Sequence, residues 1–117
     1  MIAVIFEVEI AEGRKQDYLD IAAELRPLLA QVDGFISVER FQSLTNPGKI
    51  LSLSLYRDEQ AVQDWRNLTK HRDAQSKGRS GIFSDYKLRV ASVIRDYGMF
   101  DRAETPDDSK ARHEEKG

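Results

Sequence analysis

The amino-acid sequence predicts a single α+β domain. Two observations carry this prediction: apolar residues alternate with polar ones in several short segments, as in strands, and recur every three to four residues in a longer segment, as in a helix. The length agrees, because 117 residues can bury one modest hydrophobic core but not two. With 40% hydrophobic and 32% charged residues, the composition is that of a globular chain.

The N-terminal part predicts a strand followed by a helix. Every even position from Ile2 to Ile10 is apolar, which predicts a strand with one buried face. After a turn at Gly13, an apolar stripe with helical spacing predicts a helix of about 18 residues. The stripe consists of Tyr18, Ile21, Ala22, Leu25, Leu28, Leu29 and Val32. Pro27 predicts a kink or a tightened last turn, and Asp33-Gly34 closes the helix.

The middle of the chain predicts a β-hairpin and the start of a second helix. Residues 35–43 and 50–56 are expected to be strands, because leucines alternate with serines in the second segment and Thr45-Asn46-Pro47-Gly48 between them favours a turn. Asp58 is placed to cap a helix that runs through Trp65.

The C-terminal part predicts a short helical turn, a long strand and a charged tail. A break is expected near residues 67–69, followed by a polar helical turn over 70–77. Residues 86–97 alternate again and predict the last strand. A folded domain of residues 1–98 is therefore followed by a tail of residues 99–117, either disordered or ordered only against a partner subunit.

The resulting order, β-α-β-β-α-β, is the split-βαβ or ferredoxin-like plan, a four-stranded antiparallel sheet with two helices on one face. The other face carries apolar and amphipathic residues that a chain of this length has nothing left to cover. A second copy, packed sheet against sheet around a two-fold axis, is the simplest cover. The sequence therefore predicts a homodimer.

Composition argues against several classes of function. The chain has no cysteine and only two histidines, His71 and His113, so disulfides and a protein-held metal centre are not expected. No apolar run approaches the roughly 18 residues of a membrane span, and the first residues lack signal-peptide features, so we expect a cytoplasmic protein without a membrane partner. The net charge of −2 gives no general attraction for nucleic acid. A local excess of basic residues over 66–79 could attract a small anion or could be a solvated helix face.

Over nearly all of residues 2–98, the chain resembles the antibiotic biosynthesis monooxygenase family. The resemblance lies in the opening strand, in VDGFISVERFQS, in DEQAVQDWRNLTKHRDAQSKG and in the closing VIRDYG. It implies a dimeric α+β barrel. For function it implies several alternatives, because the family includes cofactor-free oxygenases of aromatic polyketides, heme-degrading monooxygenases, quinol oxygenases and members without known activity.

Heme-degrading members resemble this chain at a helix that carries a tryptophan, here Trp65. Their iron-ligating histidine follows ten residues later, where this chain has Gln75, and a neutral amide is a poor ligand for heme iron. Those enzymes also use an asparagine near the end of the first strand, where this chain has Glu7 beside Val8. The resemblance therefore disfavours heme degradation, and no cofactor is expected.

Cofactor-free members resemble this chain more closely. In them a tryptophan is followed six residues later by a proton-transferring side chain, here Trp65 and His71, although Ala61 stands where they have an asparagine. This resemblance implies oxidation of a phenolic or quinol substrate by dioxygen. His71 would take the substrate proton, Arg66 or Arg72 would hold the resulting anion, and Trp65 would wall the pocket and stack on the ring.

Residues on the strands provide further candidates. Glu7 is expected to point away from the helices into the dimer cavity, paired with Arg89, Arg95 or a ligand; if unpaired it would protonate and act as a second base. Tyr56 and Tyr86 could hydrogen-bond a substrate in the same cavity or could complete a core or an interface.

Two functions from different classes are therefore open. The first is a homodimeric monooxygenase that oxidises a small aromatic or quinone-like molecule without metal or flavin, favoured by Trp65, His71 and the neighbouring arginines. The second is a non-catalytic small-ligand-binding or stress-related dimer, favoured by the missing asparagine, with Trp65 as a core or dimer anchor and His71 exposed. A third, an interaction module that works through the acidic tail, has only the tail in its favour.

Overall fold

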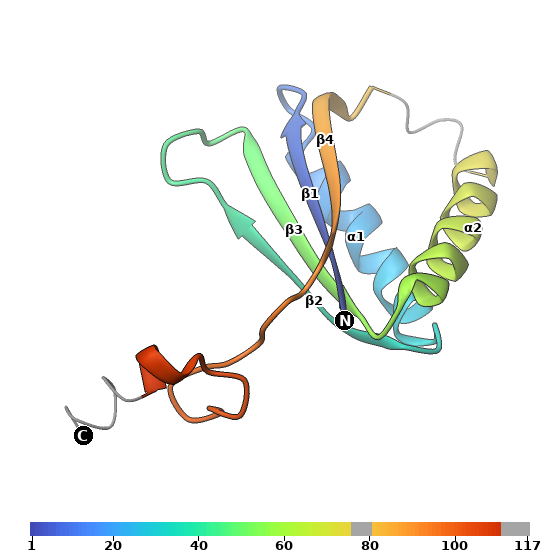
Figure 1. Cartoon of the computed structure of the whole chain (residues 1–117). Helices are drawn as coiled ribbons and strands as arrows, with labels where there is room; N and C mark the ends of the chain where they lie inside the picture. The colour runs from blue at the N-terminus through green and yellow to red at the C-terminus, as the bar shows by residue number, and fades with distance from the viewer. Residues whose placement is uncertain (76–80, 111–117) are drawn as a thin grey trace.

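A computed structural model describes residues 1–75 and 81–110 of the chain, with the side chains of residues 1–68 and 81–110 (Figure 1). The elements follow in the order β1 (Ile2–Ile10), α1 (Lys15–Ala30), β2 (Phe35–Gln42), β3 (Lys49–Tyr56), α2 (Glu59–Gln75) and β4 (Phe83–Ser92). All strand pairs are antiparallel, in the sheet order β2-β3-β1-β4. The predicted ferredoxin-like α+β fold is confirmed.

The two sides of the sheet differ because successive side chains of a strand point to opposite faces. Phe6 of β1 lies opposite Ser52 of β3 and Leu88 of β4, so even-numbered residues of these strands share one face. That face is the helix-facing side, since Val8 packs against Tyr18 of α1. The odd-numbered residues form the other side, called the open face below.

Buried residues on the helix-facing side form two clusters. One consists of Val8, Tyr18, Ile50 and Ile82, and the other of Leu29, Tyr56 and Ala61. Tyr56 is among the most deeply buried side chains of the described residues, with an exposed fraction of 1%. Both helices therefore contribute to the core, α1 along its whole length and α2 through its first turns.

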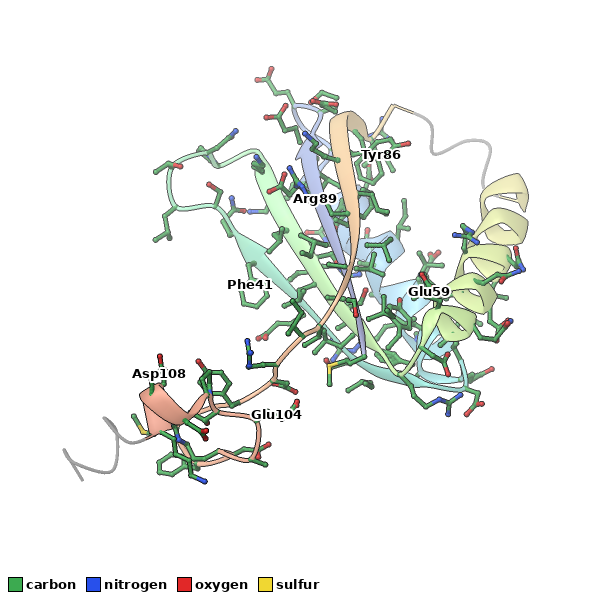
Figure 2. The ribbon with its side chains drawn as sticks, in the orientation of Figure 1. Phe41, Glu59, Tyr86, Arg89, Glu104 and Asp108 are labelled. Carbon is green, nitrogen blue, oxygen red and sulfur yellow. The ribbon has the colours of Figure 1, made fainter. Side chains whose placement is uncertain are left out.

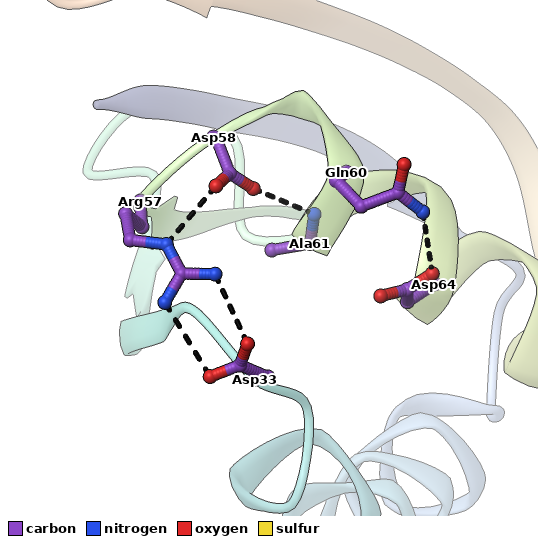
Figure 3. A network of polar contacts seen from close by, with 6 residues as sticks. All are labelled: Asp33, Arg57, Asp58, Gln60, Ala61 and Asp64. Atoms are coloured by element: carbon purple, nitrogen blue, oxygen red, sulfur yellow. Dashed lines mark hydrogen bonds and ion pairs between the residues drawn. The ribbon is translucent and has the colours of Figure 1, made fainter.

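A polar network fixes α2 at its N-terminal end. Asp58 Oδ1 accepts a hydrogen bond from the Ala61 N–H at 3.0 Å, so the predicted helix cap is confirmed. Arg57 joins this cap to the turn between α1 and β2, because its guanidinium contacts Asp58 at 3.0 Å and Asp33 at 3.1 Å (Figure 3). Gly34 lies beside the network at φ +91°, and a Cβ there would come within 3.0 Å of the Ala61 Cβ.

The same contacts set the charge of the two carboxyl groups. The hydrogen bond and the positive charge of Arg57 lower the pKa of Asp33. The pKa of Asp58 is lowered first by the backbone N–H of Ala61 and then by Arg57. Both carboxylates therefore stay ionised through the physiological range.

Two local predictions are wrong. The expected break near residues 67–69 is absent from α2, which continues to Gln75; the segment contains neither Gly nor Pro, and Asn67 and Thr69 weaken a helix only slightly. The last strand spans Phe83–Ser92 rather than residues 86–97. It ends there because Ser92 pairs with Ile2, where its partner strand β1 begins.

The open face combines an apolar area with a charged corner. The apolar area is made of Ala3 and Ile5 of β1, Phe41 of β2, Leu51, Leu53 and Leu55 of β3, and Ala91 of β4. The charged corner lies where β3, β1 and β4 carry Lys49, Glu7, Glu9, Asp85, Lys87 and Arg89. Positive and negative side chains are equal in number there, so the corner has no net charge.

Beyond β4, residues 93–110 leave the sheet and form the C-terminal arm, which contains turns and a helical turn at residues 107–110. Figure 1 shows the arm extending away from the sheet and both helices. Neither α1 nor α2 has the combination of length and apolar character that crossing a lipid bilayer requires.

Candidate functional site

The helix-facing side of β4 carries an apolar surface that stays exposed. Tyr86, Leu88 and Val90 belong to it, with exposed fractions of 63%, 51% and 49%. We call these three side chains the β4 strip. They share the face on which β3 is fully buried, so the helix layer covers one half of the sheet and leaves the other accessible. Figure 2 shows Tyr86 on the side of β4 toward α2.

Aromatic rings surround the upper end of the β4 strip. The ring of Phe6 meets that of Tyr86 at 5.6 Å and that of Phe83 at 5.8 Å, in both cases edge to face. Phe83 also contacts the ring of Tyr18 at 5.8 Å. Such a surface can hold an apolar molecule by contact with ring faces and edges, and the Tyr86 hydroxyl can supply a hydrogen bond.

Trp65 lies in α2 and is half-buried. It packs against the cluster of Leu29, Tyr56 and Ala61, so part of the indole belongs to the core and part stays accessible. The half-buried position fits both interpretations of Trp65, as a core anchor and as the wall of a site. Because α2 packs on the helix-facing side, Trp65 and the β4 strip belong to the same side of the sheet.

The basic residues of the candidate site follow Trp65 in α2. Arg66 is exposed and takes part in interactions of its own. His71 and Arg72 lie on the helix, but their side chains are outside the described residues. Since α2 is continuous, about 100° of rotation per residue places the Cα of Arg72 on the same helix face as Trp65 and that of His71 about 120° away.

Tyr56 is a core residue in this structure. Its ring contacts Phe35 at 6.1 Å, and its hydroxyl shares a hydrogen bond with Ser54. Burial raises the pKa of Tyr56, and the hydrogen bond from Ser54 opposes that rise only in part. The phenol is therefore neutral and already has a polar partner.

Glu7 is found on the open face, as expected, with a cation beside it. Arg89 Nη1 lies 3.2 Å from Glu7 Oε2, and Lys49 Nζ lies 3.9 Å from the same oxygen. The three side chains help to line a shallow hollow of about 260 Å³ on this face. Two positive charges therefore compensate the carboxylate of Glu7. Of the two expectations, a Glu7 paired with a cation and an unpaired Glu7 that acts as a base, the structure has the paired one.

The expectation of one shared cavity for Glu7, Tyr56 and Tyr86 is wrong. Glu7 pairs in register with Lys87 and lies on the open face, whereas Tyr86 contacts Phe6 on the helix-facing side and Tyr56 lies in the core there. The cause is the alternation of strand side chains, which sends residues of odd and even number in these strands to opposite faces. Within one copy, Glu7 and Trp65 cannot contact the same small molecule.

The sequence reasoning missed the apolar members of this surface. Leu88 and Val90 were identifiable as strand residues on the same face as Tyr86, and Phe6 as their neighbour on β1. No sequence signal distinguishes them from core residues, because the alternation is the same for a covered and for an uncovered strand. Among the side chains that the structure describes, no three His, Cys, Asp or Glu gather in a way that could hold a metal ion.

Comparisons with known proteins agree with the fold. Residues 1–77 match the sequence model of a family described as antibiotic biosynthesis monooxygenase. The chain is 50% identical over 93 residues to jasmonate monooxygenase ABM of Pyricularia oryzae, which covers 80% of this chain and 43% of that protein. It is 32% identical over 93 residues to the uncharacterized protein YqjZ of Bacillus subtilis, covering 80% of this chain and 79% of YqjZ.

The chain thus spans less than half the length of the jasmonate monooxygenase that it matches. Among solved structures, Rv0793 from Mycobacterium tuberculosis superposes with a TM-score of 0.70 at 13% identity, over 83% of this chain and 98% of that one. At so low an identity the likeness is evidence of the fold alone.

Proposed function

This chain belongs to the antibiotic biosynthesis monooxygenase family, and on that premise we propose that it is a monooxygenase for a small, largely apolar organic molecule. The observation that carries the proposal is the β4 strip, an apolar and aromatic surface that stays exposed on the helix-facing side of the sheet. Apolar side chains exposed on the same side of the sheet as a half-buried tryptophan favour a ligand site over a surface without function.

The first substrate class that we propose is a phenol or quinol that can lose a proton to give an electron-rich anion. Reaction with dioxygen then converts a CH₂ carbon, or an aromatic CH carbon of the phenol ring, to a carbonyl. One oxygen atom enters the carbonyl, and the other leaves as water with the two hydrogens that the substrate loses. The substrate supplies all the electrons, so no reductant is needed. His71 is the proposed base, Arg66 or Arg72 the cation that holds the anion, and Trp65 the wall beside the ring.

The second substrate class follows from the relative named for jasmonate. A jasmonate is a non-aromatic ketone with a carboxylate, so the proposed apolar surface would hold its hydrocarbon part and one of the same arginines its carboxylate. Insertion of oxygen into an unactivated C–H bond takes up two electrons and two protons besides dioxygen. For this class we therefore expect turnover only with an added two-electron reductant.

An oxygen-uptake assay separates these classes. Catechols, hydroquinones and anthrones are tested without reductant, and jasmonate with and without one. We expect turnover of one class, with Trp65→Phe and His71→Ala lowering kcat at least tenfold and His113→Ala serving as the matched control. Binding of these molecules without oxygen uptake would favour the non-catalytic ligand-binding dimer instead.

We also propose that two copies pair through the open face. Support comes from the apolar area around Leu53, which would otherwise meet water, and from the neutral charged corner, which imposes no repulsion between copies. Sedimentation of the parent should give the mass of a dimer at micromolar concentration. Leu53→Asp should give a monomer, whereas Gln63→Asp, an exposed position in α2, should not. A monomeric parent would contradict this proposal.

A further inference from the structure

Tyr86 differs from Tyr18 and Tyr56, the two buried tyrosines, in the state of its hydroxyl group. The Tyr18 hydroxyl accepts a hydrogen bond from Arg40 Nε at 3.3 Å, and the Tyr56 hydroxyl bonds with Ser54. Among the residues that the structure describes, none forms a hydrogen bond with the Tyr86 hydroxyl, and this side chain is 63% exposed. The Tyr86 hydroxyl is therefore available to a bound molecule.

The ring of Tyr86 is held in place although its hydroxyl is free. It meets the ring of Phe6 at 5.6 Å and that of Phe83 at 6.4 Å, with interplanar angles of 86° and 61°. Phe6 packs in turn against the core cluster of Val8, Tyr18, Ile50 and Ile82. Because these contacts orient the ring before a ligand arrives, a hydrogen bond from its hydroxyl requires little further ordering.

The hydroxyl stands at one end of an apolar surface. Leu88 and Val90 follow Tyr86 on the same face of β4, roughly 7 Å and 14 Å along the strand. Their neighbours on β1 are Phe6 and Val4, which are also apolar. A molecule that lies along the β4 strip thus meets a hydrogen-bonding side chain at one end and hydrocarbon beyond it.

The other end of the β4 strip lies at the level of Trp65. Val90 pairs with Val4, and both Val4 and Trp65 pack against the core cluster of Leu29, Tyr56 and Ala61. Tyr86 belongs to the opposite end of the sheet, because its neighbour Phe6 packs against the other core cluster. The direction in which a molecule lies on the strip therefore decides which of its ends comes to the level of Trp65.

We propose that Tyr86 determines specificity at this site by donating a hydrogen bond from its hydroxyl to a carbonyl or phenol oxygen at one end of the substrate. The bond directs the hydrocarbon part of the substrate along Leu88 and Val90. None of the three side chains of the strip is charged, so the oxygen group that binds there is an uncharged one. This inference rests on the proposed function and deepens it, because it names the group that the strip selects.

The test measures the binding of two probes to the full chain in the absence of oxygen. The first is a cyclohexanone with a pentyl chain opposite its carbonyl, and the second is pentylcyclohexane, which lacks only the carbonyl oxygen. Tyr86→Phe removes the hydroxyl but keeps the ring. It should raise the dissociation constant of the ketone about five- to tenfold, because one neutral hydrogen bond is lost, and leave that of the hydrocarbon nearly unchanged.

Two variants serve as controls. Tyr97→Phe removes a hydroxyl from a partly exposed tyrosine of the C-terminal arm and should change neither dissociation constant. Leu88→Ala removes apolar contact from the strip and should raise both constants by a similar factor. Urea denaturation of Tyr86→Phe should match that of the parent, since the contacts with Phe6 and Phe83 remain.

NOEs measure the direction of the bound ketone in the parent chain. The terminal methyl protons of the pentyl chain should give NOEs to Val90, and the ring protons beside the carbonyl should give NOEs to Tyr86. NOEs in the reverse sense would overturn the inference. So would a parent that binds neither probe, an unchanged ketone constant in Tyr86→Phe, or equal losses for both probes.

These measurements do not depend on turnover, so the two proposals fail separately. If the oxygen-uptake assay detects no reaction but Tyr86→Phe selectively weakens the ketone, the proposed monooxygenase fails and the role of Tyr86 stands. If oxygen is consumed and the ketone constant of Tyr86→Phe equals that of the parent, the monooxygenase stands and the role of Tyr86 is overturned.

Discussion

β3 and β4 both pair with β1, and in both strands successive side chains point to opposite faces of the sheet. Their helix-facing sides nevertheless differ in which side chains are buried. On β3 that side carries two serines and these are buried, with exposed fractions of 9% for Ser52 and 6% for Ser54. On β4 it carries Leu88 and Val90, and these are about half exposed. On this side of the sheet the serines of β3 are thus buried, whereas Leu88 and Val90 of β4 are exposed.

The difference arises from where the helices lie. β3 is an inner strand, and the first turns of α2 and the end of α1 cover its Tyr56 end. β4 is an edge strand: α1 reaches its first residue, Phe83, through Tyr18, whereas Leu88 and Val90 stay about half exposed. Small serines let the helices approach β3 closely, while the apolar residues of β4 stay available. β4, whose apolar residues on this side resemble those of a core strand, is thus the strand that can contact a ligand.

The largest expected effect separates the two tyrosines of these strands. Tyr56→Ala should lower the free energy of unfolding by about 3 kcal/mol or more, because it removes a buried ring. Tyr86→Ala should lower it by about 1 kcal/mol, chiefly through the lost contacts with Phe6 and Phe83. Urea denaturation of both variants measures the difference. Equal losses would mean that β4 is covered in the protein, and the comparison would fail.

A smaller effect concerns the serines of the same face. Ser54→Ala deprives the buried Tyr56 hydroxyl of its partner and should lower the free energy of unfolding by about 1–2 kcal/mol. The same substitution on β4, Ser92→Ala, should cause no measurable change because Ser92 is exposed. If both variants unfold like the parent, the hydrogen bond between Ser54 and Tyr56 contributes nothing to stability.

The open face of β4 should contribute less still. Arg89→Ala removes the closer of the two cations from Glu7, and since both side chains are partly exposed we expect a loss of about 1 kcal/mol or less. Glu7→Gln should leave oxygen uptake unchanged, because Glu7 lies across the sheet from Trp65. A fall in kcat for Glu7→Gln in a folded dimer would instead place the chemistry on the open face.

A last comparison, in which the difference between two pH values is small, tests how α2 is held beside β3. Asp58→Ala removes the cap and should lower stability, whereas Asp58→Asn keeps an acceptor for the Ala61 N–H and should lower it less. The pKa of Asp58 is lowered in the folded state from its usual 3.8, so the stabilisation by its charge is present above pH 4 and is lost as the pH falls through the lower folded pKa. Thermal unfolding at pH 7 and pH 3 should therefore show the difference between parent and Asp58→Ala shrinking on acidification. A difference that is the same at both pH values would rule out a contribution from the charge.

Much of the fold could be predicted from the sequence, because helical and strand periodicities are local. The alternation of Ile2–Ile10 and the turn at Pro47-Gly48 gave the right elements, and Asp58 was rightly expected to cap α2. The end of β4 could not be predicted from its own residues. It is set by Ile2, the point where the distant partner strand begins.

The sequence by itself determined the order of strands and helices and most of their residues, and it determined which way the strand side chains point, including Glu7 away from the helices. These properties depend on backbone geometry over a few residues. Only the tertiary structure decided that Arg89, distant in sequence, pairs with Glu7, that Tyr56 is buried, and that Tyr86 is uncovered. Coverage depends on where elements far along the chain come to lie, and local periodicity carries no information about that.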